Sequence, residues 1–267
     1  MWESVGSERI GRDAVYAEER QARIVSIARA EGRVEVNRLA AELDVTQETI
    51  RRDLTVLERH GQLRRVHGGA IPIERLGFEP GIGAREAVMV AEKERIAKAA
   101  LEQVPEEGSI LLDAGTTTAQ LAEVLPVDRE LTVVTNALDI AVRLAARPNL
   151  TVLALGGRVR GRTLAAVDVW AAETLASTFV DVAFMATNGV SAERGLTTPD
   201  PTEAAVKRAM IGAARRAVLL ADHTKIGNDH LVRFAELDDI DTAITDSQVD
   251  ATLLAELRAA GLQVVCA

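Results

Sequence analysis

The sequence has almost no cysteine and few aromatic residues. Its 267 residues include one cysteine, Cys266, and aromatic residues make up 3% of the chain. A single cysteine excludes an intramolecular disulfide and is typical of proteins in a reducing cytosol. With so few aromatic rings, the core must consist of Ala, Val, Leu and Ile. The scarcity also argues against a protein that stacks on the bases of single-stranded nucleic acid.

Long apolar runs are absent as well. No run approaches the roughly 18–20 residues that cross a bilayer, and the first residues, MWESVGSERIGRDAVY, lack the apolar stretch of a signal peptide. We therefore expect a cytoplasmic protein that has no membrane partner, with a disordered extension over residues 1–17. Hydrophobic residues still make up 48% of the chain and charged residues 27%, which predicts a packed globular protein.

The net charge of −9 argues against nucleic-acid binding, but this charge is unevenly distributed. Residues 18–75 carry 11 Lys and Arg against 10 Asp and Glu, which is a net charge of +1, whereas the residues after 75 carry −9. The acidity therefore belongs to the C-terminal part of the chain. Any case for DNA binding must rest on how the arginines of residues 18–75 are clustered.

Residues 18–72 contain three helical patterns and one hairpin pattern. Apolar residues recur at helical spacing in Gln21–Ala30 and Val36–Leu43, and Thr46 is placed as the N-cap of a third helix. Gln62–Ile71 has the pattern of a basic β-hairpin with glycines at its turn. Three short helices, the last two joined by a tight turn, followed by such a hairpin predict a winged helix-turn-helix domain.

The polar face of the third helix and the hairpin carry the candidate DNA contacts. In the major groove Gln can read adenine and Arg can read guanine, while hydroxyl and basic groups reach phosphates. An ordinary three-helix bundle with solvated arginines is the alternative, and the tight turn, the capped helix and the basic hairpin together favour DNA binding. The candidate DNA-binding residues are Thr46, Gln47, Glu48, Thr49, Arg51, Arg52, Arg64, Arg65, His67 and Gly68.

Residues 73–91, which follow Pro72 and contain Pro80 and three glycines, predict a linker. Apolar strand-like runs then alternate with helical patterns, and continuous apolar strands indicate a sheet covered on both faces. The sequence therefore predicts a doubly wound, mostly parallel α/β domain over residues 92–267. The strand-like runs are Ser109–Leu112, Leu131–Thr135, Leu150–Leu155, Val182–Ala186, Ala217–Ala221, Thr242–Thr245 and Leu262–Val265. The helical patterns include Thr118–Leu125, Ala137–Ala146, Thr202–Ala214 and Ala251–Ala260.

Polar segments follow several of these strands, at the edge of the sheet where such folds bind ligands. The first, Asp113-Ala114-Gly115-Thr116-Thr117-Thr118, opens a helix whose N–H groups and hydroxyls suit a phosphate monoester. A plain helix cap is the alternative. The segment is neither a P-loop nor a GxGxxG fingerprint, which disfavours nucleoside triphosphates and dinucleotides. Further candidates at strand ends are Asn136, Gly157, Arg158, Asp222 and Lys225, each of which alone is also typical of a turn or a surface charge.

Two smaller signals indicate ordinary surface chemistry. Asp222-His223 and Asp229-His230 have no metal-ligand spacing, so we expect a polar loop, no metal and no cofactor. Glu203 and Lys207 lie four residues apart on a predicted helix, which favours a surface ion pair over a place in the wall of a binding pocket.

The string VTQETIRRDLTVLERHGQLRRVHGGA resembles the signature of the DeoR family of bacterial repressors, and the resemblance extends from about Arg20 to Ile71. From about Glu92 onward, LLDAGTTTAQLA, VVTNALDIA, LGGRVR, GLTTPDPTEAAVKRAMI and LLADHTKIG resemble successive blocks of that family's effector domain. The resemblance implies a domain like ribose-5-phosphate isomerases that senses phosphorylated sugars or related intermediates. Two residues depart from the family pattern, which has an aspartate where Asn188 stands and a glycine where Asp168 stands.

Block by block, the resemblance implies one set of effector contacts, which are Asp113, Gly115, Thr116, Thr117, Thr118, Asn136, Gly157, Arg158, Asp222 and Lys225. The resulting hypothesis is a repressor of sugar or polyol catabolism genes that a phosphorylated sugar releases from double-stranded operator DNA. Reading two half-sites favours a homodimer or homotetramer.

Two other functions remain open at this stage. One is a sugar-phosphate isomerase or hydrolase with an accessory DNA-binding head, in which Asp113, Glu203 or Asp222 acts as acid or base beside Lys225. The other is a DNA-binding protein whose α/β domain only oligomerises.

Overall fold

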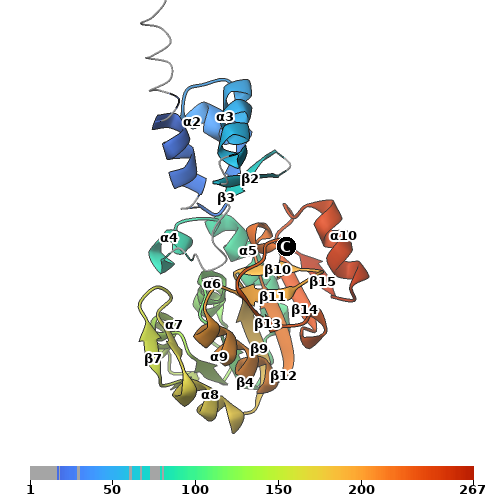
Figure 1. Ribbon diagram of the computed structural model, residues 1–267. Helices are drawn as coiled ribbons and strands as arrows, with labels where there is room; N and C mark the ends of the chain where they lie inside the picture. The colour runs from blue at the N-terminus through green and yellow to red at the C-terminus, as the bar shows by residue number, and fades with distance from the viewer. Residues whose placement is uncertain are drawn as a thin grey trace, which may run out of the picture. The chain divides into compact units, whose positions relative to one another are not determined.

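The computed structural model describes residues 17, 19–28, 31–59, 62–66, 68–72, 79 and 81–267. The chain divides into two compact units, residues 1–75 and residues 76–267 (Figure 1). The extension predicted for residues 1–17 lies outside the described residues, apart from Ala17. Among the described residues, no helix is long and apolar enough to cross a membrane.

The first unit combines three helices with a small sheet. Residues 19–28 are helical. The elements that follow are β1 (Val34–Glu35), α2 (Val36–Glu42), α3 (Gln47–Arg59), β2 (Leu63–Val66) and β3 (Gly69–Pro72). The strands pair antiparallel in the order β1-β3-β2. The predicted helix-turn-helix and hairpin are confirmed, whereas strand β1 was not predicted.

The core of this unit forms where the apolar faces of its helices meet. Ile24, Leu39, Ile50 and Leu54 are at most 1% exposed, as the helical spacing of the apolar residues requires. A charged residue, Asp53, lies on the same face of α3 and is also buried. Its carboxylate accepts hydrogen bonds from Arg20 at 2.6 Å and from Gln21 at 2.9 Å, which offset the cost of its burial. Burial of this face leaves the opposite face of α3 in solvent.

Two neighbouring glycines of the hairpin have different purposes. Gly68 lies in the turn at φ +75°, a conformation that glycine adopts without strain. Gly69 lies in β3, where a Cβ atom would stand 1.9 Å from the carbonyl oxygen of Val34 on β1. The hairpin pattern predicted both glycines at the turn. The second one instead allows β1 to pair closely with the hairpin.

The second unit is built on a seven-stranded parallel sheet. Its strand order is β15-β14-β12-β9-β4-β5-β6, and all six neighbouring pairs are parallel. The strands are β4 (Gly108–Leu112), β5 (Leu131–Thr135), β6 (Leu150–Ala154), β9 (Val180–Ala186), β12 (Ala214–Leu220), β14 (Thr242–Thr245) and β15 (Val264–Cys266). Each coincides with a predicted run to within about three residues. The predicted doubly wound α/β domain is confirmed.

The chain reverses its direction across this sheet between β4 and β9. It proceeds from β4 through β5 to β6, and then resumes at β9 on the other side of β4. Because parallel crossovers are right-handed, the helices of the two halves cover opposite faces. The helices are α4 (Ile82–Glu86), α5 (Val90–Ala100), α6 (Thr116–Val124), α7 (Leu138–Leu144), α8 (Val169–Ala176), α9 (Pro201–Gly212) and α10 (Ala251–Ala259). The carboxyl ends of β4 and β9 thus form the switch point at which open α/β sheets bind ligands.

Several elements of this unit have no counterpart in the predicted pattern. They are the hairpin β7 (Arg158–Arg160) and β8 (Ala165–Val167), and a small antiparallel sheet of β10 (Gly189–Ser191), β11 (Gly195–Thr198) and β13 (Val232–Ala235). Single-turn 3-10 helices η1, η2 and η3 occupy Leu101–Gln103, His223–Lys225 and Leu237–Asp239. Helix α4 and the buried residue Glu79 fall within the stretch 73–91 that was predicted to be a linker.

Candidate DNA-binding surface and ligand site

The exposed face of α3 carries most of the candidate DNA contacts. Thr46 caps this helix as predicted, because its hydroxyl oxygen accepts a hydrogen bond from the backbone N–H of Thr49 at 3.2 Å. Gln47, Glu48, Arg51 and Arg52 are exposed, and Thr49 is half-buried.

Arg51 and Arg52 differ in how they are held. Arg51 Nη2 donates to Gln47 Oε1 at 3.3 Å, and its Nη1 lies 3.7 Å from Glu48 Oε2. Arg52 forms no ion pair with any residue that the structure describes, so its guanidinium is available to a ligand. The face therefore offers two guanidinium groups and an amide to solvent, which are the groups that read base edges and phosphates.

Strand β2 of the hairpin carries two further arginines, of which Arg65 lies beside α3. Arg64 and Arg65 on β2 are exposed. Arg65 Nη1 donates to Thr55 Oγ1 of α3 at 3.2 Å, one turn beyond Arg51. His67 lies outside the described residues, and Gly68 is exposed in the turn.

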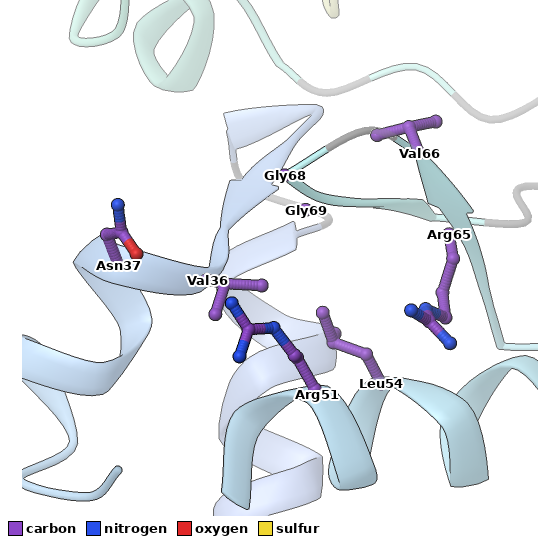
Figure 2. A pocket seen from close by; sticks show the side chains of 8 residues that line it. All are labelled: Val36, Asn37, Arg51, Leu54, Arg65, Val66, Gly68 and Gly69. Carbon is purple, nitrogen blue, oxygen red and sulfur yellow. The ribbon is translucent and has the colours of Figure 1, made fainter. Parts of the chain in front are cut away.

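A hollow of about 320 Å³ lies between α3, the start of α2 and the hairpin (Figure 2). Arg51 and Arg65 both line it, together with the backbone of Gly68 and the side chain of Asn37, which the sequence analysis missed. Asn37 is exposed on α2, a position that carries no DNA-reading signal by residue type alone. Two guanidinium groups around one hollow suit a phosphate of the DNA backbone.

In the second unit, Asp113 lies at the switch point and is fully buried. Its Oδ2 accepts a hydrogen bond from the backbone N–H of Ala186 at the end of β9, at 2.9 Å, and forms an ion pair with Lys207 of α9. Lys207 Nζ also donates to the carbonyl oxygen of Ala186 at 3.0 Å and lies 5.4 Å from the centre of the Phe234 ring. Asp113 Oδ1 is buried without a hydrogen-bond partner among the described residues. A ligand hydroxyl would satisfy it.

The three threonines after Asp113 divide into two kinds. Thr118 is fully buried, and its hydroxyl donates to the carbonyl oxygens of Asp113 and Gly115 at 2.6 and 2.8 Å, so it fixes the loop. The hydroxyls of Thr116 and Thr117 form no hydrogen bond with any described residue, although both residues are buried. They stand at the N-terminus of α6, whose first N–H groups have no partner within the helix. These donors favour an anion.

Gly115 allows this loop to lie against β9, because a Cβ atom at this position would stand 2.6 Å from Ala186 Cβ. Asn136, at the end of β5, holds the loop from the other side. Its Oδ1 accepts from the backbone N–H of Ala114 at 3.0 Å, and its Nδ2 donates to the carbonyl oxygen of Ala166 on β8 at 3.3 Å. Both ends of the amide are thus used within the protein, so Asn136 positions the loop.

Gly157 and Arg158 belong to the hairpin β7–β8. Gly157 has φ +145°, and a Cβ atom there would lie 2.4 Å from the carbonyl oxygen of Val167. Arg158 is exposed, and its Nε lies 2.6 Å from Asp168 Oδ2. Its Nη2 lies 3.5 Å from the Thr202 hydroxyl at the start of α9. Arg158 is thus occupied by Asp168.

Asp222 and Lys225 lie beyond the end of β12, which is two strands from β4 in the sheet. Asp222 Oδ1 accepts from the backbone N–H of Thr224 at 3.0 Å and from its hydroxyl, and so caps η2. Neither Asp222 nor Lys225 is bonded to Asp113 within the part of the chain that the structure describes. The charges of both act instead on Lys93 of α5, a buried residue that the sequence analysis missed because its helix reads as a charged surface helix.

Burial, opposed by the negative charge of Asp222 and assisted by the positive charges of Lys225 and Arg85, lowers the pKa of Lys93 to about 8. Lys93 Nζ donates to the carbonyl oxygens of Arg85 and Val88, the latter at 2.6 Å.

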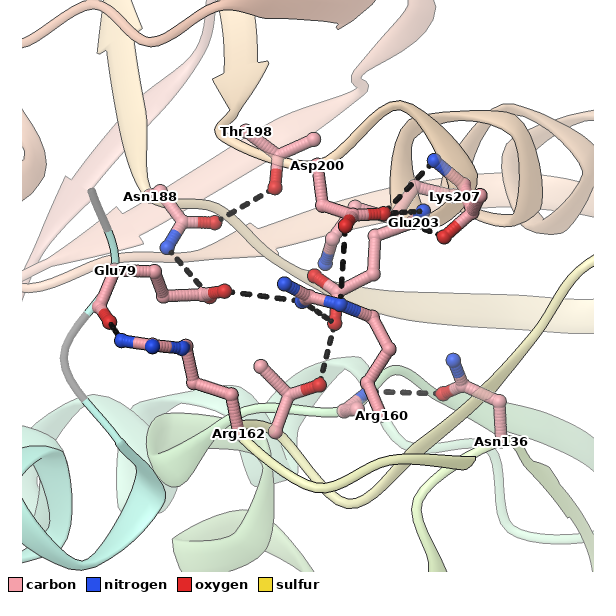
Figure 3. A network of polar contacts seen from close by, with 12 residues as sticks. Glu79, Asn136, Arg160, Arg162, Asn188, Thr198, Asp200, Glu203 and Lys207 are labelled. Atoms are coloured by element: carbon pink, nitrogen blue, oxygen red, sulfur yellow. Dashed lines mark hydrogen bonds and ion pairs between the residues drawn. The ribbon is translucent and has the colours of Figure 1, made fainter. Parts of the chain in front are cut away.

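Glu203 and Lys207 do not form the expected surface ion pair. Both are buried, at 5% and 4% exposure. Lys207 pairs with Asp113, as described above, and Glu203 Oε1 lies 2.6 Å from Arg160 Nη1 and accepts from the Thr163 hydroxyl at 2.5 Å (Figure 3). The spacing i, i+4 placed them on one face of a helix correctly. It could not tell that this face packs against β8 and the switch point.

The loop around Asp222 contains a buried hydrogen-bonded pair, His223 and Asp246. His223 Nδ1 lies 2.9 Å from Asp246 Oδ1. Burial opposes ionisation of Asp246, but the hydrogen bonds from His223 and Gln248 together outweigh burial and hold the pKa of this carboxyl below its ordinary value. Among the described residues, no three His, Cys, Asp or Glu side chains are grouped so as to hold a metal ion.

Comparisons with known proteins identify the two domains and the family. A family model for the DeoR-like helix-turn-helix domain matches residues 20–75, and a model for the DeoR C terminal sensor domain matches residues 88–247. The chain is 38% identical over 247 residues to the HTH-type transcriptional regulator GlpR of Haloferax volcanii, which covers 92% of this chain and 96% of that protein. It is 32% identical over 231 residues to the transcriptional repressor AccR of Agrobacterium fabrum, which covers 86% of this chain and 90% of that protein.

Among solved structures, the full-length sorbitol operon regulator SorC from Klebsiella pneumoniae matches at 12% identity with a TM-score of 0.41, covering 89% of this chain and 98% of that chain. The family models and the two relatives, each matched along most of its length, carry the assignment. The chain therefore belongs to the DeoR family of transcriptional regulators, with a DNA-binding helix-turn-helix domain followed by a sensor domain.

Proposed function

We propose that this protein represses genes of sugar or polyol catabolism and that a phosphorylated sugar releases it from operator DNA. The observation that carries the proposal is the buried Asp113–Lys207 pair at the switch point, next to the unbound donors of Thr116 and Thr117. The same chain carries an arginine-rich helix-turn-helix. One relative is named a transcriptional repressor.

The two ends of the site suit the two ends of such a ligand. The N–H groups at the start of α6 and the hydroxyls of Thr116 and Thr117 would hold the phosphate, because they are donors with no other partner among the described residues. The free Oδ1 of Asp113 would accept a hydrogen bond from a sugar hydroxyl. Lys207 balances the charge of Asp113, so the sugar end need not be charged.

On DNA, α3 enters the major groove, where Arg51 and Arg52 reach base edges or phosphates and Arg64 and Arg65 follow the backbone. Two copies would read two half-sites about 34 Å apart, which requires a homodimer or a homotetramer. Operator binding places the protein in the cytoplasm.

The effector changes DNA affinity only if it binds one arrangement of the protein more tightly than another. The proposal therefore requires that the sugar phosphate bind free protein more tightly than protein on DNA.

The first test uses wild-type protein and a double variant, Thr116→Val with Thr117→Val. Thermal-shift screening against sugar and polyol phosphates identifies a ligand, which should raise the melting temperature of the wild type. The double variant should lose this response and keep its affinity for a DNA duplex selected from a random pool by the wild type. Thr132→Val with Thr151→Val, which changes two strand threonines of the same sheet, is the matched control. A normal response in the Thr116 and Thr117 variant would refute the assignment of the phosphate site.

We also propose that the site binds its ligand without turnover. Asp113 is held by Lys207 and Ala186, Asp222 by Thr224, and Glu203 by Arg160 and Thr163. All three acid–base candidates are therefore engaged within the protein. Purified protein incubated with ribose 5-phosphate should show no ribulose 5-phosphate above the level of a blank. Sustained isomerisation would refute this part of the proposal.

A further inference from the structure

Glu79 is a buried carboxylate that the scheme above does not use. Its side chain is 2% exposed. Its Oε2 lies 3.0 Å from Arg160 Nη1, and its Oε1 accepts a hydrogen bond from Asn188 Nδ2 at 3.1 Å (Figure 3). Arg85 Nη1 lies 3.6 Å from Oε1, and Arg162 donates to the carbonyl oxygen of Glu79. The sensor unit thus binds this carboxylate as it would bind an anionic ligand.

The surrounding residues form a balanced charge network that we call the Glu79 cage. Arg160 also contacts Asp200 Oδ2 at 3.2 Å and Glu203 Oε1 at 2.6 Å. The cationic members of the Glu79 cage are Arg85, Arg160 and Arg162, and the anionic members of the cage are Glu79, Asp200 and Glu203. Removal of the Glu79 carboxylate would leave the cage with a net charge of +1, which favours the entry of another anion.

The hydrogen bonding between the cage and the Glu79 carboxylate is incomplete. The 3.6 Å separation from Arg85 is too long for a hydrogen bond. Arg85 Nε and Nη2 are also buried without a hydrogen-bond partner among the described residues. Buried guanidinium donors without acceptors are costly. An anion with more acceptor atoms, or with freedom to approach Arg85, would satisfy donors that Glu79 leaves unused.

The cage lies one helical turn from the site of the sugar. Glu203 of the cage and Lys207 of the Asp113 pair are four residues apart on α9, which is a rise of about 6 Å along the helix axis. A ligand whose phosphate is at the start of α6 and whose hydroxyl contacts Asp113 would therefore direct its far end toward the cage.

We propose that the Glu79 cage is a carboxylate-binding site, which Glu79 fills when no effector is bound and which the carboxylate of a phosphorylated sugar acid takes over. The inference rests on the proposed function, because it assigns the second end of the same ligand. It adds the ligand class: an open-chain acid with a phosphate at one end and a carboxylate at the other.

Exchange of the two carboxylates would also act on the chain near the DNA-binding unit. Glu79 lies four residues beyond Arg75, the last residue of that unit. Among the described residues it is the attachment of the sensor unit closest in sequence to the DNA-binding unit. Loss of this attachment on effector binding is a change that DNA affinity can report.

The test compares matched pairs of probes by calorimetric titration. The pairs are 6-phosphogluconate with glucitol 6-phosphate, and 3-phosphoglycerate with glycerol 3-phosphate, which differ in the carboxylate. In wild-type protein the acid of at least one pair should bind about tenfold more tightly than the alcohol. The carboxylate of the acid forms charge-assisted hydrogen bonds with the arginines of the cage, and the alcohol has no group that forms them. An internal group that fills a site nine-tenths of the time raises the Kd of a competing ligand about tenfold. Glu79→Gln should therefore bind the acid up to about tenfold more tightly than wild type.

Glu86→Gln is the matched control, because Glu86 is an exposed glutamate of α4 that pairs with Arg143 at 3.5 Å and does not belong to the cage. It should bind both probes like wild type. A second readout needs no variant. In wild-type protein, hydrogen exchange of the peptide that contains Glu79 and Ile82 should accelerate with the acid and not with the alcohol.

The outcomes separate this inference from the proposed function. If alcohols bind and acids bind no better, or if Glu79→Gln leaves the Kd of the acid unchanged, the cage is not the carboxylate site and the phosphate site stands. Slower or unchanged exchange around Glu79 with a bound acid overturns it too, even if Glu79→Gln fails to fold. If no probe of either kind binds wild type, the proposed function and this inference both fail.

Discussion

Asp168 adopts a backbone conformation that only glycine adopts without strain. Its φ is +78° and its ψ is −170°, at the start of α8. A side chain is tolerated here because its carboxylate pairs with Arg158. We predict that Asp168→Gly is more stable than Asp168→Ala, which reverses the usual order of these two residues.

The comparison of the two variants isolates the strain. Both lose the ion pair with Arg158, so that contribution cancels. A residue other than glycine in this region of φ and ψ costs about 1–3 kcal/mol. Glycine loses roughly 0.4–1 kcal/mol relative to alanine through the entropy of the unfolded chain. The glycine variant should therefore exceed the alanine variant by about 1–2 kcal/mol in free energy of unfolding. For a unit of this size that difference is roughly 2–8 °C in Tm.

Scanning calorimetry of the full chain measures this difference. The larger unit, residues 76–267, should give the transition of higher enthalpy, because enthalpy of unfolding scales with the number of residues. Only that transition should move between the two variants. An alanine variant as stable as the glycine variant would mean that Asp168 is not strained, and the reasoning would fail.

Three further predictions concern the DNA surface, the hairpin and Lys93. Arg52→Ala should weaken binding to a selected DNA duplex by about 1–3 kcal/mol if the arginine reads a base; unchanged affinity in gel-shift titrations of this variant and of Arg51→Ala would refute the role of α3. Gly69→Ala should destabilise the first unit by about 2 kcal/mol or more, since its Cβ meets the backbone of Val34; a urea midpoint equal to that of wild type would contradict this. The pKa of Lys93 is about 8 in the folded protein against 10.5 ordinarily. Between these values the unfolded chain binds more protons, so wild type should gain about 1.4 kcal/mol of stability per pH unit relative to Lys93→Met as the pH rises above 8; parallel stability curves from pH 7 to 9.5 would contradict the shift.

Regular elements were predictable because their apolar periodicity is local. The inner parallel strands β4, β5, β9, β12 and β14 are runs rich in Val, Leu, Ile and Ala that are largely buried on both faces. A short window of sequence therefore contains the whole signal. The capped third helix was predictable for the same reason, since the Thr46 hydroxyl acts only three residues away. Strand β1 is two residues long, and its pairing with β3 depends on Gly69, more than thirty residues later. No local pattern reports such a pairing.

The ligand site was predictable only in part. Asp113 and the three threonines stand together in sequence, so their position at the start of a helix revealed them. Residue type alone could not show that the Thr118 hydroxyl donates a hydrogen bond within the loop. Nor could it show that both the oxygen and the nitrogen of the Asn136 amide form hydrogen bonds with the backbone. Those roles depend on contacts between strands.

Contacts of buried charged residues with partners far away in the sequence could not be predicted. Lys207 pairs with Asp113 across 94 positions, and Glu79 meets Asn188 across 109. In sequence, a lysine on a helix and a glutamate in a proline- and glycine-containing stretch are typical of solvated residues. Their burial follows from the packing of α9 and the hairpin β7–β8 against the switch point, which is a property of the folded chain.

The central claim is that one ligand at the switch point sets the DNA affinity of the other unit. The most direct measurement is the Kd for a selected DNA duplex, by fluorescence anisotropy, with and without a saturating sugar phosphate that stabilises the protein. The account predicts a Kd that rises with ligand, and a ligand Kd that rises by the same factor when DNA is saturating, because the coupling of two binding equilibria is reciprocal. Equal DNA affinity with and without bound ligand would contradict it.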